Sequence, residues 1–202
     1  MTRSSDIFPT VAAKKALRKQ LLAQRRALTA DAWKFKSDAI CLKLAQSEWV
    51  QNAQTILVYW GDRQEPDLRP LWEHHFPDKQ WGLPRCVEKQ LVWHRWQPME
   101  ANQLQPGPYG ILEPLPTLPI LLPSAVDLIL VPAVGCDRRG FRLGYGGGFY
   151  DRLFGDPAWA NIPTIGIVFE FAFLAELTPD PWDYPLKAVC TELGMTLSRL
   201  RR

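Results

Sequence analysis

The chain has few of the residues from which disulfide frameworks and zinc sites are built. Among its 202 residues are only three histidines and four cysteines, and the cysteines lie far apart without a C-x-x-C pair: Cys41, Cys86, Cys136 and Cys190. We therefore expect neither a disulfide-stabilised fold nor a zinc site, and a reducing compartment fits this cysteine usage. Buried thiols that behave as small hydrophobic side chains are the default expectation.

A long uninterrupted apolar run is also missing. Three prolines and an aspartate interrupt the richest apolar stretch, residues 118–134, and the first ten residues contain no apolar segment of the signal-peptide type. We expect neither a membrane span nor a signal peptide, and we predict a cytoplasmic protein without a membrane partner. Residues 1–10 are expected to be a poorly ordered N-terminus.

Charge of one sign is not concentrated anywhere in the sequence. The 24 Lys and Arg residues are interleaved with 21 Asp and Glu residues, which leaves a net charge of +3. This distribution disfavours nucleic acid as a partner and fits a small anionic ligand better. Without a heptad or an internal repeat, and with 47% hydrophobic residues, the chain is expected to form one monomeric domain over residues 11–202.

Two helices are predicted at the start of the chain. Residues 11–28 are good helix formers with apolar side chains at helical spacing, and Thr29 can cap a second helix that extends to about Gln46. At 100° per residue, Lys14, Arg18 and Arg25 fall within about 40° of one another beside the apolar stripe of the first helix.

Continuously apolar strands follow, alternating with helical segments. Strands are expected at Thr55–Trp60, Gln80–Pro84, Leu91–Trp96, Asp127–Val131 and Thr164–Phe169, with a helix at Asp67–Phe76 and a long irregular connection between Pro106 and Pro123. Strands of this kind are typical of a mostly parallel sheet that is covered on both faces. The sequence therefore predicts an α/β protein, a three-layer α/β/α single domain.

The most informative stretch is R-L-G-Y-G-G-G-F-Y-D, from Arg142 to Asp151, just before a short helix that ends at Gly155. Its glycines permit positive φ and remove Cβ atoms, so that backbone N–H groups can converge on phosphate oxygens. The stretch is neither a Walker A loop nor G-x-G-x-x-G. Arg142 can neutralise phosphate charge and Asp151 can hold Mg²⁺. A glycine-rich turn that only permits tight packing is the alternative.

The stretch R-L-G-Y-G-G-G-F-Y-D-R resembles the signature of the 5-formyltetrahydrofolate cyclo-ligases, also called methenyltetrahydrofolate synthetases. The likeness extends over nearly the whole chain, with further matching segments at residues 14–18 (K-K-A-L-R), 59–68, 83–85 (L-P-R), 109–114 (Y-G-I-L-E-P) and 188–192 (A-V-C-T-E). The fold that the resemblance implies is similar to that of sugar-phosphate isomerases and CoA transferases.

The resemblance also implies the residues of the site. ATP would be bound by Lys14, Lys15, Ala16, Leu17 and Arg18, and by Arg142, Leu143, Gly144, Tyr145, Gly146, Gly147, Gly148, Phe149 and Tyr150. The folate pocket would be lined by Trp60, Glu65, Tyr109, Tyr145, Gly146, Gly147, Gly148 and Phe149. Arg142 and Glu65 are the implied catalytic residues, and Asp151 would bind Mg²⁺. Cations on one helix face suit a triphosphate, and aromatic rings suit a flat pterin.

Two positions depart from the family pattern. Lys187 stands where a second acidic residue that helps with magnesium is expected, so Asp183 or water remains a candidate for that contact. The family's threonine shortly after the glutamate is Leu68 here.

The implied reaction is the ATP-dependent conversion of 5-formyltetrahydrofolate to 5,10-methenyltetrahydrofolate, with release of ADP and phosphate. The loop amides and Arg142 would stabilise the transferring phosphoryl group, Lys14 and Arg18 would bind the remaining phosphates, and Glu65 would orient the folate. Two alternatives stay open: a sugar-phosphate isomerase that uses the same anion cradle without ATP, and a non-catalytic folate-binding or regulatory protein.

Simpler interpretations exist for several of these residues. Apart from the motif, Lys14 and Arg18 are an ordinary solvated helix face, and Glu65 before Pro66 can simply begin a helix. Trp60 can be a core residue. Three further residues are expected to be packed in the core, the histidine with a hydrogen bond: Trp93, His94 and Trp96.

Overall fold

The structure, a computed structural model, describes residues 11–199, so the predicted poorly ordered segment 1–10 lies outside the described residues. Its main sheet consists of β1 (Thr55–Leu57), β2 (Gln80–Val87), β3 (Gln90–Trp96), β6 (Leu128–Pro132), β9 (Thr164–Ile167), β11 (Ala188–Thr191) and β12 (Gly194–Leu197). The strand order is β12-β11-β9-β6-β1-β2-β3. The five inner strands run parallel, and β12 and β3 pair antiparallel at the two edges.

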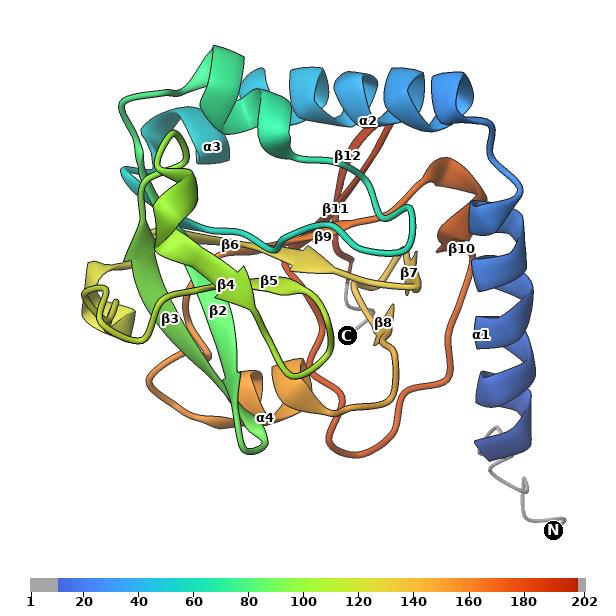
Figure 1. The fold of residues 1–202 in the computed structure, drawn as a ribbon. Coiled ribbons are helices and arrows are strands. Elements are labelled where there is room, and N and C mark those ends of the chain that lie inside the picture. Colours follow the sequence, from blue (N-terminus) through green and yellow to red (C-terminus); the bar gives the residue numbers. More distant parts are fainter. Residues whose placement is uncertain (1–10, 200–202) are drawn as a thin grey trace, which may run out of the picture.

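Helices cover both faces of this sheet, as Figure 1 shows. The α-helices are α1 (Val11–Arg26), α2 (Ala30–Ala45), α3 (Glu48–Asn52) and α4 (Phe149–Gly155). On one face α2 buries Ile40 and Leu44, and on the other face α4 buries Leu153 and Phe154. The predicted three-layer α/β architecture with a mostly parallel sheet is thereby confirmed.

The two N-terminal helices lie close to their predicted positions. Thr29 accepts a hydrogen bond from the backbone N–H of Ala32 at 3.2 Å and caps α2, as its position in the sequence predicts. In Figure 1, α1 stands beyond the end of the sheet toward which β6 points. Helix α1 therefore reaches the carboxyl ends of the parallel strands, where open α/β sheets bind ligands.

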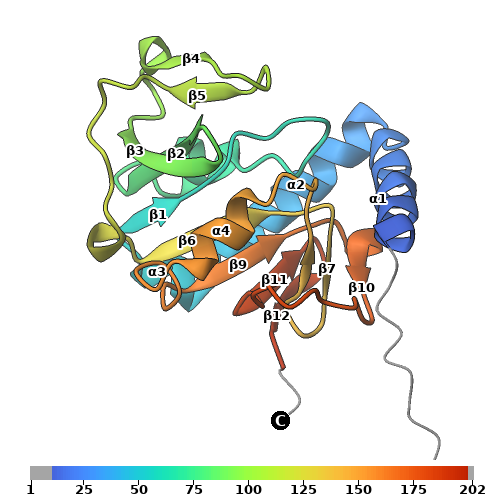
Figure 2. The same cartoon turned by 90° about the horizontal axis from the view of Figure 1, so that it is seen from below.

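Short elements complete the fold, and most of them were not predicted. A second sheet is formed by β7 (Gly135–Asp137), β8 (Arg142–Leu143) and β10 (Phe173–Leu174), and a hairpin by β4 (Leu104–Pro106) and β5 (Leu112–Pro114). Residues 11–199 also contain three 3-10 turns, η2 (Ala101–Gln103), η3 (Pro123–Ala125) and η4 (Glu170–Ala172), and a π-helix, η1 (Leu71–His75). Figure 2 shows the hairpin beside β2 and β3. The connection after Pro106 is thus not wholly irregular.

The helix predicted at Asp67–Phe76 is helical from Arg69 on, and its residues Leu71–His75 form the π-helix η1. The Asp67 carboxylate accepts the backbone N–H of Arg69 at 3.1 Å and so caps the start of this segment. Within residues 11–199, no helix is long and apolar enough to cross a membrane.

Candidate functional site

The glycine loop, Gly144–Gly148, connects β8 to α4. Gly146 has φ +97° and Gly148, which precedes the first turn of α4, has φ +68°. Side chains with a Cβ rarely adopt this left-handed backbone, so glycine is required at both places. Tyr145, Gly146 and Gly147 are exposed. The loop therefore offers its main chain to solvent at the position where the sequence predicts a phosphate cradle.

Arg142 and Asp151 lie together at the base of the glycine loop. The Arg142 guanidinium donates to Oδ1 of Asp151 and lies over the rings of Tyr150 and Phe154, 5.6 and 5.3 Å from their centroids. The side chain of Arg142 is only 5% exposed, and that of Asp151 is 28% exposed. A desolvated planar cation is thus held rigidly beside a carboxylate that remains open to a further ligand.

Helix α1 brings its basic residues to the same region. Arg18 Nε donates to the carbonyl oxygen of Gly144 at 2.6 Å, and Lys14 Nζ lies 2.6 Å from Asp180 and 3.2 Å from Asp183. Burial lowers the pKa of Lys14, but its bonds to the two aspartates outweigh that effect and raise it. Lys14 is therefore a stable ammonium group.

The other residues of the K-K-A-L-R segment have different surroundings. Lys15 and Ala16 are exposed on α1, whereas Leu17 packs against the core cluster that contains Leu21. Leu143 is buried in that cluster as well.

Glu65 is buried and is joined to the glycine loop. Only 6% of the residue is exposed. Its Oε1 accepts the Tyr145 hydroxyl at 2.6 Å, and its Oε2 accepts the backbone N–H of Asp62 at 3.1 Å. Burial raises the pKa of Glu65, and the hydrogen bond from Tyr145 and the charge of Arg25 oppose that rise. The structure thus brings together the glutamate and the glycine loop, 80 residues apart in the sequence.

The turn that carries Glu65 has a strained backbone. Arg63 and Gln64 have φ of 49° and 57°, a conformation that costs non-glycine residues about 1–2 kcal/mol each. Side chains from other elements fix the turn: Trp33 Nε1 donates to Glu65 O at 2.8 Å, and Tyr59 donates to Pro66 O at 2.8 Å. Glu65 does not begin a helix, so the simpler interpretation of this residue is wrong.

The aromatic residues expected at the folate pocket form two groups. Tyr109, 57% exposed between β4 and β5, contacts Phe149 edge-on, with ring centroids 5.9 Å apart. Trp60 contacts Trp96 edge-on, also at 5.9 Å. Trp60 and Glu65 line a pocket of about 210 Å³ together with Trp33, Gly61, Asp67, Arg69 and Trp72.

The residues expected in the core are there. Trp93 and Trp96 are buried, and so is His94, whose Nδ1 lies 2.8 Å from Leu118 O. Cys41, Cys136 and Cys190 are buried as expected, whereas Cys86 is only half-buried. Burial raises the pKa of the Cys136 and Cys190 thiols to about 12, which makes them unreactive.

The two positions that depart from the family pattern have clear surroundings. Leu68 is 2% exposed and belongs to the core cluster on the α2 side of the sheet. Lys187 is exposed, whereas Asp183 is bonded to Lys14. Between residues 11 and 199, no group of three or more His, Cys, Asp or Glu side chains can hold a metal ion. Mg²⁺ commonly takes one or two carboxylates and completes its shell with substrate phosphates and water, so the donor chemistry of Asp151 fits this ion.

Three residues at the site were given no role from the sequence. Arg152 donates to Gly147 O at 2.7 Å and to Lys89 O at 2.6 Å, which ties the glycine loop to the turn between β2 and β3. Arg25 contacts Glu65 and Tyr145, and Asp180 contacts Lys14. Two signals in the sequence could have pointed to these residues. Arg152 stands at the end of the glycine signature, and Arg25 lies on the cationic face of α1.

Comparison with known proteins agrees with this geometry. Residues 10–192 match the model of the 5-formyltetrahydrofolate cyclo-ligase family. The chain is 32% identical to a 5-formyltetrahydrofolate cyclo-ligase of Haemophilus influenzae, over 82% of this chain and 76% of that protein. It is 30% identical to one of Escherichia coli, over 83% and 94%. A 5,10-methenyltetrahydrofolate synthetase structure from Aquifex aeolicus superposes with a TM-score of 0.81 at 28% identity, covering 94% of each chain. The chain therefore belongs to the 5-formyltetrahydrofolate cyclo-ligase family.

Proposed function

We propose that this protein converts 5-formyltetrahydrofolate and ATP to 5,10-methenyltetrahydrofolate, ADP and phosphate. The observation that carries the proposal is the direct hydrogen bond between two half-sites, the glycine loop expected to bind nucleotide and the pocket of Glu65 expected to bind folate. The glycine loop with Arg142 and Asp151 has the chemistry of a phosphate site, and its Tyr145 bonds the buried Glu65 of the expected folate pocket. A nucleotide at the loop would therefore lie beside a pterin at Glu65.

The chemistry explains why ATP is needed. The formyl carbon on N5 is a poor electrophile because the nitrogen donates electron density into the carbonyl. The formyl oxygen attacks the γ-phosphorus, and the bond between that phosphorus and the ADP oxygen breaks. N10 then adds to the activated carbon and loses its proton, and the carbon–oxygen bond breaks to release phosphate. Positioning and charge stabilisation are the protein's main contributions to such a transfer.

We assign Arg142 and the loop amides to the transferring phosphoryl group. The guanidinium of Arg142 is rigidly packed and desolvated, so its electrostatic effect on developing phosphate charge is large. Lys14 and Arg18 are assigned to the remaining phosphates, for which they would exchange their present partners, Asp180 and the Gly144 carbonyl. Glu65 is assigned to the pterin, where its carboxylate can accept N–H groups of the ring.

Asp151 is the residue that we propose for Mg²⁺, because it is a partly exposed carboxylate beside the phosphate loop. When bound with ATP, the ion would reduce the negative charge of the phosphates. Arg142 donates to the Asp151 carboxylate in this structure, and with nucleotide bound it would also donate to phosphate oxygens.

The test supplies the purified protein with 5-formyltetrahydrofolate and Mg-ATP. We expect growth of the methenyl absorbance together with stoichiometric ADP. Calorimetric binding of folate without ADP release would support a folate-binding regulator. Turnover of sugar phosphates without ATP would support an isomerase. Either result, with no methenyl product, would overturn the proposal.

A further inference from the structure

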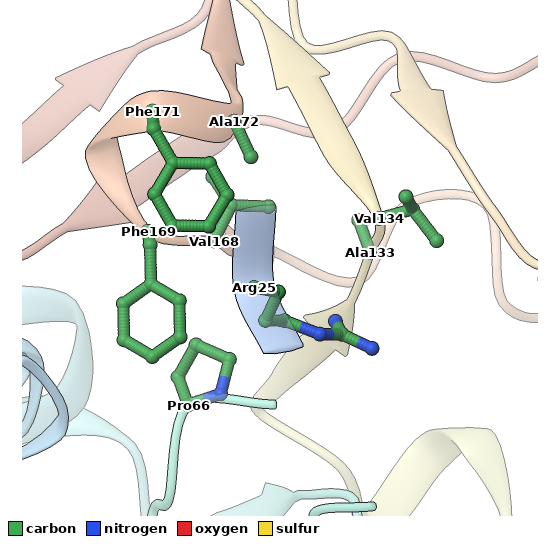
Figure 3. A pocket seen from close by; sticks show the side chains of 8 residues that line it. All are labelled: Arg25, Pro66, Ala133, Val134, Val168, Phe169, Phe171 and Ala172. Carbon is green, nitrogen blue, oxygen red and sulfur yellow. The ribbon is translucent and has the colours of Figure 1, made fainter. Parts of the chain in front are cut away.

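Arg25 is a buried cation with no assigned role, placed at the carboxyl ends of three parallel strands. It is 4% exposed, although it belongs to the first and largely exposed helix of the chain. A cavity of about 10 Å³ beside it is lined by residues that follow β1, β6 and β9: Pro66, Ala133, Val134, Val168, Phe169, Phe171 and Ala172. Figure 3 shows the Arg25 side chain among them. An arginine is rarely enclosed in this way unless its charge is paired.

The partners of Arg25 are the two residues that join the half-sites. Its Nη2 donates to the Tyr145 hydroxyl oxygen, its Nη1 lies 4.0 Å from Oε1 of Glu65, and its guanidinium lies 5.6 Å from the Tyr145 ring centroid. Tyr145 in turn donates to Glu65 at 2.6 Å. A cation that donates to the phenol oxygen makes the phenol a stronger donor to the carboxylate.

Arg25 also holds the strained turn before Glu65. Its Nε donates to the carbonyl oxygen of Arg63 at 3.0 Å, and Arg63 is one of the two residues of this turn with left-handed backbone. One guanidinium therefore fixes both the path of the main chain and the direction of the carboxylate. Because Arg25 is buried against Glu65, we assign it no phosphate contact, in contrast to Lys14 and Arg18, the half-buried cations of the same helix face.

We propose that Arg25 is the positioning residue of the folate site: it keeps Glu65 a carboxylate and holds Tyr145 against it, so that Glu65 can accept hydrogen bonds from the pterin. This inference rests on the proposed function. It assigns no contact between Arg25 and either substrate.

The electrostatic surroundings of Glu65 support the proposal. Burial raises the pKa of Glu65. The hydrogen bond from Tyr145, the charge of Arg25 and the backbone N–H of Asp62 oppose this rise, whereas the charge of Asp62 adds to it. The groups that face Glu65 come from several elements, Arg25 from α1, Tyr145 from the glycine loop, Tyr59 from the end of β1, Tyr150 from α4 and Asp62 from its own turn. Among these described groups, Arg25 is the positively charged one. Without it, Glu65 should bind a proton at higher pH.

The test compares the pH dependence of kcat/KM for 5-formyltetrahydrofolate in the wild type and in Arg25→Met. If Glu65 must be ionised to bind the pterin, activity falls as the pH falls through the pKa of Glu65 in the free enzyme. Removal of the cation should move this acid limb to higher pH by about one unit or more. At neutral pH the KM for the folate should rise several-fold while the KM for ATP stays unchanged. Arg26→Met, at the exposed neighbouring arginine of α1, is the matched control.

Three further variants keep the test decisive if Arg25→Met folds poorly. Tyr145→Phe removes only the hydroxyl and should also displace the acid limb upward, whereas Arg25→Lys should restore much of the wild-type limb. In a Glu65→Gln background, the acid limb should be absent with or without Arg25. If Tyr145→Phe and Arg25→Met keep the acid limb of the wild type, and the wild type is active, the role of Arg25 is overturned while the proposed function stands. Absence of turnover in the wild type would instead overturn the proposed function.

Discussion

Arg142 has several partners at this site, so its substitution should lower the activity severely. The guanidinium lies over the rings of Tyr150 and Phe154 and is bonded to Asp151, so its position is fixed before the nucleotide binds. We expect Arg142→Ala to lower kcat about 10²–10³-fold, because a preorganised donor to the transferring phosphoryl group is removed. Steady-state measurement of methenyl formation tests this.

The control for Arg142 is Arg138→Ala, an exposed arginine on the turn before β8. It should retain wild-type kcat, and both variants should keep the wild-type circular dichroism spectrum. Near-normal turnover of Arg142→Ala would remove this residue from the chemistry.

The sequence predicted which residues belong to the site better than it predicted which residues they contact. The periodicity of α1 placed Lys14, Arg18 and Arg25 on one face, but it does not distinguish an exposed cation from a buried one. Arg25 is enclosed because strand ends distant in sequence, such as those before Ala133 and Val168, meet around it. Such meetings depend on the strand order, which no local pattern encodes.

The turn that links β7 to β8 is organised by one carboxylate. Asp137 has a fully buried side chain and accepts the backbone N–H groups of Arg139, Phe141 and Leu177 at 2.8 to 3.0 Å. The Arg139 guanidinium adds a salt bridge at 3.0 Å. This single side chain therefore fixes the start of β8, and with it the position of Arg142.

We expect Asp137→Ala to destabilise the protein by about 3 kcal/mol, because buried donors and a cation lose their acceptor. Urea unfolding measures the change. Asp156→Ala is the control, since the Asp156 carboxylate also accepts a backbone N–H, from Ala158 at 2.9 Å, but at an exposed turn. The control should lose less than about 1 kcal/mol; equal losses would contradict the special role of Asp137.

Elements with a helical period or a continuous apolar run were predicted, and strands with neither were not. Helices α1 and α2 follow from their apolar spacing, and the buried strands β1, β6 and β9 from continuous apolar runs. The two-residue strands β8 and β10 carry no pattern that can be recognised. Their pairing is set by long-range contacts, as between Phe173 and Cys136.

On the scale of the molecule, one sheet separates two apolar clusters. One cluster contains Ile40 and Leu44 of α2, the other Leu21 of α1 and Leu153 of α4, and neighbouring residues of the same strand alternate between them. Neither cluster can lose its packing without exposing the sheet that both share.

We therefore propose that residues 11–202 form one domain that unfolds as one cooperative unit. Tryptophan fluorescence, far-UV and near-UV circular dichroism should give coincident urea transitions. Light scattering should give the mass of a single chain, 23.1 kDa. Separate transitions would contradict a single domain, and a mass of twice that value would contradict a monomer.

The anchoring of α1 has a consequence for the order in which the protein becomes active during synthesis. Its Lys14 is bonded to Asp180, 166 residues later in the chain, and its Arg18 to Gly144, 126 residues later. Helix α1 therefore leaves the ribosome well before the residues that orient its cations are translated. A nascent chain should thus remain unable to bind nucleotide until the segment that contains Asp180 has emerged.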